Sequence, residues 1–184
     1  DNNNPAALTL SNPFSPARGS IGGTANGYGF EMNAPAQYLQ SWNLTLERGI
    51  GDASAVEFAY TGSKGTHLGR RYDINQVIRQ LEFQLPNGKF PRPYPDFSSI
   101  NYYAFCSNST YNSGMATYRR RFSRGFFFRV NYVYSKSIDY GSQISGSGNG
   151  TYNGAMDSRN LKLDRGRSDF DVGHSFTFAF SYEV

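Results

Sequence analysis

Aromatic and polar residues alternate along several stretches of this chain, and this period of two constrains its fold more than any other feature. From 126 to 135 the even positions carry Phe, Phe, Val, Tyr and Tyr, whereas the odd positions carry Phe, Arg, Asn, Val and Ser. Successive side chains of a strand point to opposite faces of a sheet, so this spacing predicts a strand with one aromatic face. Similar alternation predicts further strands within 38–49, 54–63, 115–122 and 174–183.

Short turns join these strands in pairs. "GIGD" at 49–52 separates the first two, and Ser123–Gly125 separates the strand at 115–122 from the one that begins at Phe126. Connections this short force antiparallel pairing, so each pair is predicted to be a hairpin.

The remaining stretches are less regular. A short strand is expected around 70–75 and another from Ile100 into a polar end, while 83–99, with four prolines and an Asn-Gly, is expected to be a loop. A long Gly- and Ser-rich loop follows at 139–160, and "AMDSRNLKLDRG" is compatible with one helical turn.

Together these patterns predict an all-β fold. We expect antiparallel β-hairpins in a meander of about six to eight strands, forming an open or partial barrel-like sheet with long Gly/Pro-rich loops. Residues 1–37 are expected to form an extended lead-in rich in Pro, Gly and Asn, and residues 38–184 the antiparallel β domain.

Composition excludes several classes of protein. No apolar run approaches the roughly 20 residues of a membrane helix. The polar start lacks the basic and apolar regions of a signal peptide, and the chain begins as if cut from a longer protein. The single cysteine, Cys106, excludes an internal disulfide and is expected to be a structural thiol, with an intermolecular bridge as the lesser alternative.

The sequence offers little chemistry. Asp164, Asp169 and Asp171 are weak candidates for a calcium site, although their order does not match an EF-hand loop. His67 and His174 have no second ligand at metal spacing, and no nucleophile motif is present. We therefore expect a non-enzymatic protein with no catalytic residues and no cofactor.

"RGFFFRVNY" at 124–132 imitates the aromatic strand of an RNA-recognition fold. Phe127 and Arg129 depart from that pattern, and the two helices of such a fold are missing. No nucleic-acid partner is expected. The aromatic and branched residues are instead expected to be structural packing residues, chief among them Trp42, Leu44, Phe58, Tyr60, Phe126, Phe128, Tyr132, Phe176 and Phe178.

Three longer segments resemble a known family. They are "QSWNLTLERGIGDASAVEFAYTGSKGTHLGRRYDINQ", "YNSGMATYRRRFSRGFFFRVNYVYSKSID" and "DSRNLKLDRGRSDFDVGHSFTFAFSYE". In this order they resemble the later part of the β-barrel of Oar-like TonB-dependent outer-membrane receptors, without the plug or the TonB box. The resemblance covers about residues 35 to 184 and implies strands that face two different solvents.

Two main functions are compatible with this resemblance. Too few strands for a large barrel leave unpaired edges, which favours a self-assembling extracellular β-rich filament or tube whose partners are copies of itself. The alternative is a fragment of an outer-membrane TonB-dependent receptor in contact with outer-membrane lipid. A small soluble binding barrel is a weaker option. The expected location is extracellular or in the outer membrane of a Gram-negative-type bacterium.

Overall fold

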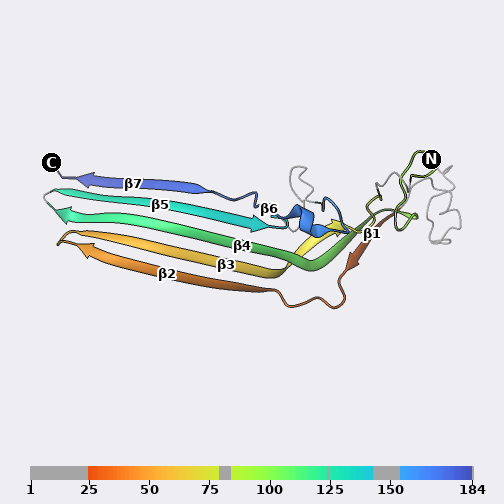
Figure 1. Ribbon diagram of the computed structural model, residues 1–184, viewed down its shortest axis with the longest axis horizontal. Helices are drawn as coiled ribbons and strands as arrows, with labels where there is room; N and C mark the ends of the chain where they lie inside the picture. Colours follow the sequence, from red (N-terminus) through yellow and green to blue (C-terminus); the bar gives the residue numbers. More distant parts are fainter. Residues whose placement is uncertain (1–24, 79–83, 124, 143–153, 184) are drawn as a thin grey trace, which may run out of the picture.

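The computed structural model describes residues 25–78, 84–123, 125–142 and 154–183, and it is an unclosed seven-stranded sheet (Figure 1). Its strands are β1 (Ala25–Phe30), β2 (Tyr38–Ile50), β3 (Ser54–Asp73), β4 (Phe97–Ser123), β5 (Phe126–Asp139), β6 (Gly166–Arg167) and β7 (His174–Tyr182). The predicted all-β, open architecture is confirmed. The predicted helical turn is a 3-10 helix, η3 (Leu161–Asp164), and no helix in the described ranges is long and apolar enough to cross a membrane.

Antiparallel hairpins form the body of the sheet. β2, β3, β4, β5 and β7 lie side by side in that order, and β6 pairs with the last two residues of β5. The turns after β2 and β4 place Gly51 and Gly125 at φ +59° and +75°, where a side chain is disfavoured. Both turns lie at the same end of the sheet, which we call the short-turn end. The long connections lie at the opposite end, the long-loop end (Figure 1).

Two strands are longer than the sequence pattern indicated. β4 runs for 27 residues without a break, although 100–114 and 115–122 looked like separate strands. β3 continues through register shifts near Gly65 and Leu68 to Asp73. The polar residues of these stretches do not end the strands because the backbone of each continues to pair with its neighbour.

The described end of the predicted lead-in, residues 1–37, contains a strand. This strand, β1, pairs in parallel with β4, from Ala25 opposite Phe97 to Phe30 opposite Tyr103. The physical reason is a vacant edge: β5 ends opposite Ser109, so the first part of β4 has no partner on that side until β1 arrives. Residues 1–24 lie outside the described residues.

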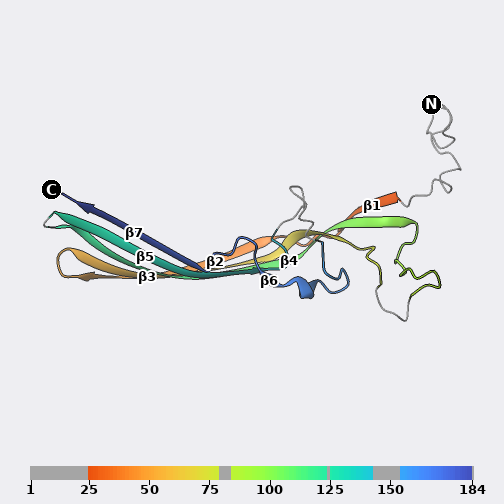
Figure 2. The ribbon, with the colours of Figure 1, turned by 90° about the horizontal axis from the view of Figure 1, so that it is seen from above.

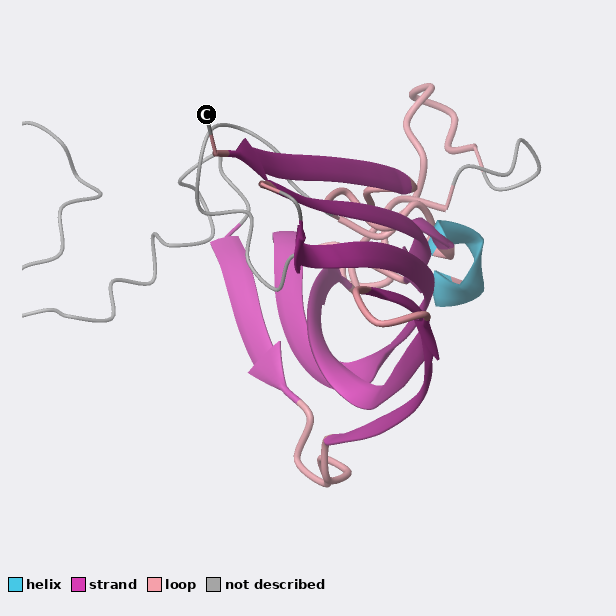
Figure 3. Cartoon of the chain, turned by 90° about the vertical axis from the view of Figure 1, so that its left-hand side faces the viewer, coloured by secondary structure: helices cyan, strands magenta, loops and turns pink. Residues whose placement is uncertain are grey.

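The sheet is curved but does not close. Seen from the short-turn end, the strands follow an open arc (Figure 3), and the view from above shows the same long, thin layer (Figure 2). Within the described ranges, β2 and β7 each have one neighbour along their length. A small soluble binding module would need a closed barrel, and these strands do not form one.

Burial is inverted relative to a water-soluble domain. Large apolar side chains are exposed on β2, β3, β5 and β7, whereas the buried side chains are mostly polar. The only buried hydrophobic residues in the described part of the chain are two alanines, Ala104 and Ala155. A sheet of this kind has no core of its own between its faces.

Candidate functional site: a two-faced wall with an ordered long-loop end

The apolar face of the sheet consists of the even-numbered residues of 38–50, 54–66, 110–120, 126–138 and 174–182. Pairing of neighbouring strands aligns these positions in rows, because residues opposite each other point to the same side. One row that crosses all five strands contains Leu46, Phe58, Ala116, Tyr132 and Phe176. All nine predicted packing residues lie on this face. Phe126 and Phe128 are half-buried, and the other seven are exposed.

The height of this apolar face matches a bilayer. From Trp42 to Ile50, β2 advances about 26 Å at roughly 3.3 Å per residue. A tilt of about 40° reduces this to about 20 Å, close to the roughly 25 Å apolar band of an outer-membrane barrel. At the end of this face nearer the long loops lie Trp42, Tyr60 and Tyr134, where such barrels carry an aromatic girdle.

The opposite face is polar. Directly next to the apolar row above lies a row made of Glu47, Glu57, Thr117, Asn131 and Thr177. Thr117 is buried, and its hydroxyl donates a 2.8 Å hydrogen bond to Asn131 Oδ1, while Arg119 pairs with Glu47 across two strands. The wall therefore separates an apolar environment on one side from an aqueous one on the other.

Asn75 organises the long-loop end. It is fully buried, and its Nδ2 donates to the carbonyls of Tyr94 (3.0 Å) and Phe97 (2.8 Å) while its Oδ1 accepts from the Tyr94 amide (2.8 Å). Arg92 Nη1 donates to the Asn75 carbonyl at 2.7 Å. One side chain thus ties the loop that precedes β4 to the end of β3.

Arg70 and Gln76 tie the second long connection to β3. Arg70 is 4% exposed and forms a 2.5 Å ion pair with Asp164 of η3. Gln76 donates to the Ala155 carbonyl (2.6 Å) and accepts from the Ser158 amide (2.8 Å). The long connections before β4 and before β7 are therefore both anchored to residues 70–76, at the end of β3 and just after it.

The three calcium candidates are not brought together. Asp164 pairs with Arg70, and Asp171 accepts from the Ser137 amide (2.6 Å) and pairs with Arg167 (2.6 Å). Asp169 is exposed. No group of three or more His, Cys, Asp or Glu in the described ranges is placed to hold a metal ion, and calcium binding stays a prediction.

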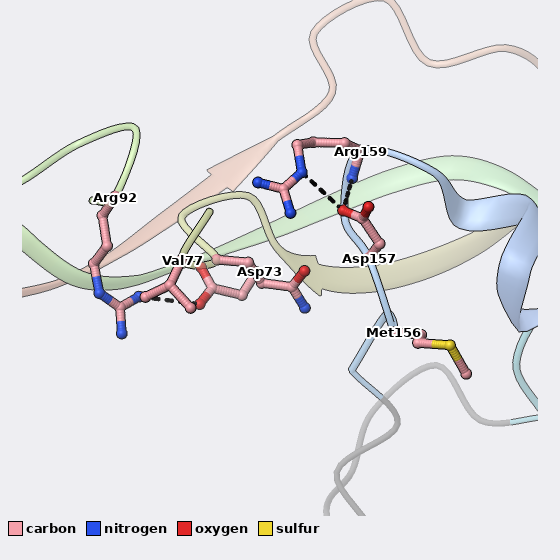
Figure 4. Close-up of a pocket in the computed structure, with 7 residues that line it drawn as sticks. Asp73, Val77, Arg92, Met156, Asp157 and Arg159 are labelled. Atoms are coloured by element: carbon pink, nitrogen blue, oxygen red, sulfur yellow. Dashed lines mark hydrogen bonds and ion pairs between the residues drawn. The ribbon is translucent and has the colours of Figure 1, made fainter. Parts of the chain in front are cut away.

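A polar cleft of about 610 Å³ opens beside these anchors (Figure 4). It is lined by Asp73, Gln76, Val77, Arg92, Met156, Asp157 and Arg159. The backbone amide of Arg159 donates to Asp157 and, with the Arg159 guanidinium, holds the pKa of Asp157 below its usual range. The cleft offers both signs of charge to solvent, which suits a polar solute better than an apolar one.

The sequence patterns missed these anchors. Arg70, Asn75 and Gln76 belong to "GRRYDINQ", and the signal available was a run of polar residues at the end of a strand, next to a Pro-rich loop. Cys106 is free and exposed.

The sheet is open, with one apolar face of bilayer height and one polar face. It has short turns at one end and long loops at the other. These are the features of a section of an outer-membrane barrel wall. A family model described as outer membrane beta barrel domain matches residues 1–184, and the chain belongs to this family. It is a protein of the Gram-negative outer membrane. Searches of curated proteins and of solved structures found no match.

Proposed function

We propose that the chain forms a section of the wall and the extracellular rim of a receptor-type barrel resembling the Oar-like TonB-dependent receptors. The observation that carries the proposal is the two-faced sheet with bare edges. In this role the sheet surrounds part of a passage through the membrane and carries extracellular loops. It does not catalyse a reaction.

The bare edges call for further strands. β2 exposes its backbone amides and carbonyls on the side away from β3, and β7 does so on the side away from β5. In lipid each unpaired group would cost several kcal/mol, so spanning sheets close on themselves. Large outer-membrane transporters close with about 22 strands, and a section of this width would form part of such a ring.

The lengths of the connections set the orientation. Barrels of this class have short periplasmic turns and longer extracellular loops, so we infer that the Gly51 and Gly125 turns face the periplasm. β4 is roughly 90 Å long at about 3.3 Å per residue, whereas a tilted strand crosses the hydrocarbon core in about 40 Å. More than half of β4, with the loops anchored by Asn75, therefore projects outside the cell.

Self-assembly into an extracellular filament or tube is the second candidate function. The same bare edges favour it, because the free side of β2 in one copy can pair with the free side of β7 in the next. The two candidates differ in what covers the apolar face: lipid in a barrel wall, protein or water in a filament.

Trp42 provides the test, because it is the single tryptophan of the chain and lies on the apolar face, 43% exposed. The full chain is reconstituted in phosphatidylcholine vesicles with and without lipid brominated along its acyl chains. We expect strong quenching of Trp42 fluorescence by the brominated lipid, with weak quenching by aqueous acrylamide. Fibres of regular diameter in negative stain, with Trp42 untouched by brominated lipid, would instead establish the filament.

A further inference from the structure

Charge on the apolar face follows a strict pattern. The even positions that define this face contain no Asp or Glu. Its permanent cations lie only near its two ends: Arg48 and Arg120 toward the short turns, and Lys64 and Lys136 toward the long loops. Acidic residues of the same strands lie on the polar face. A water-exposed surface would carry both signs of charge interspersed.

Lys64 and Lys136 form a pair at the end of the apolar face nearer the long loops. Lys136 lies in the row of Asn112, Gly62 and Trp42, and Lys64 lies one row further toward the long loops. They stand two strands apart, which gives about 10 Å across the sheet and about 7 Å along it, or roughly 12 Å in all. Both are exposed, and neither forms an ion pair with the described residues.

An apolar hollow lies next to the lysine pair, on the side toward the short turns. Its volume is about 370 Å³, and its walls include Leu44, Phe58, Tyr60 and Tyr132. Gly114 and Ala116 lie between these walls, and a Cβ added at Gly114 would meet nothing within 4 Å. Small residues flanked by large ones leave a depression open to whatever covers the face. At the margin of the hollow nearer the long loops, the Tyr60 hydroxyl donates to Asn112 Oδ1 at 2.6 Å. Asn112 lies in the row of Lys136.

We propose that the lysine pair and the hollow together form a binding site for an anionic lipid of the leaflet nearer the long loops. The head-group phosphate lies against Lys64 and Lys136, and an acyl chain fills the depression over Gly114 and Ala116. This inference rests on the proposed function, because it requires the apolar face to contact lipid. The absence of carboxylates on this face leaves the phosphate without a competing or repelling anion.

Trp42 reports on this site because it shares a row with Lys136. The full chain is reconstituted in vesicles that contain the same mole fraction of either brominated phosphatidylglycerol or brominated phosphatidylcholine. We expect the anionic lipid to quench Trp42 more strongly. A basic residue near a membrane surface strengthens the binding of anionic lipid about fivefold, so each lysine should contribute a factor of about this size to the relative binding constant.

Variants separate the two parts of the site. The double variant Lys64→Gln/Lys136→Gln should lose the preference for the anionic lipid, and Lys89→Gln, which removes the same charge from an exposed loop, should keep it. Gly114→Leu, whose Cβ would meet nothing within 4 Å, should fill the hollow and lower quenching by both lipids. Far-UV circular dichroism of each variant establishes that the sheet is retained.

The outcomes distinguish the two proposals. Equal quenching by both lipids in the wild-type chain, or a preference that survives in the double variant, would overturn the lipid site and leave the barrel wall intact. Loss of the preference in excess inorganic phosphate would show an anion site without a lipid, and would also overturn it. No quenching by either lipid would refute the barrel wall itself.

Discussion

Replacement of Asn75 by alanine should release the loop that precedes β4. The Asn75 side chain makes three hydrogen bonds, two to Tyr94 and one to Phe97, in a site with no exposed surface. Alanine cannot make any of them, and water cannot reach the site to replace them unless the loop opens.

The expected magnitude follows from these three bonds. A typical intramolecular hydrogen bond contributes about 0.5–1.5 kcal/mol net, and a buried group left unpaired costs about 1–3 kcal/mol. Three bonds lost together should therefore lower the free energy of local opening by about 3 kcal/mol. At about 1.4 kcal/mol per factor of ten, the loop should open about 100-fold more often.

Amide hydrogen exchange measures this opening. The Phe97 amide is a suitable reporter because its own acceptor, the Tyr94 carbonyl at 3.2 Å, is retained in Asn75→Ala. The matched control is Asn87→Ala, which removes one exposed hydrogen bond from the Lys89 amide in the same loop and should change exchange only a few-fold. Similar exchange at Phe97 in the two variants would refute the role assigned to Asn75.

Three further predictions concern other parts of the wall. Asp164→Asn leaves the buried Arg70 guanidinium without its ion pair and should destabilise the β5–β7 connection by about 3–5 kcal/mol, measurable by hydrogen exchange, whereas unchanged exchange would count against the anchor. Gly62→Ala places a methyl group against the Trp42 ring and should shift its fluorescence emission; an unaltered spectrum would show that the ring does not lie there. Cys106 is exposed on the part of β4 that lies outside the cell in the proposed orientation, and it should react with a membrane-impermeant maleimide added to intact cells; labelling only after lysis would reverse the orientation.

The faces of the sheet were predictable because one physical rule governs them. Alternation along a strand fixes which side chains share a side, and short turns fix the register of each hairpin. Phe58 could therefore be grouped with Val56 and Tyr60, and Tyr132 with Phe128, from spacing alone. Spacing could not tell that this face stays uncovered within the chain, since the same pattern occurs on a strand that packs against a protein core.

The long-loop end was not predictable in the same way. Asn75 and Arg70 act through partners that lie between 19 and 94 residues away in the sequence, and no periodic pattern connects such positions. β1 was missed for a related reason. Its pairing with β4 depends on where β5 ends, which is a property of the whole sheet rather than of the sequence "ANGYGF".

The two ends of the molecule therefore rely on different forces. In the proposed barrel wall, strand pairing and the covering of aromatic side chains by lipid would stabilise the membrane span. Beyond it, the described residues bury only Ala104 and Ala155 among apolar side chains, so burial of hydrophobic surface contributes little. Buried, hydrogen-bonded polar groups such as Asn75 take its place. The loops should thus tolerate changes at exposed positions such as Asn87 and lose their order when one buried anchor is removed.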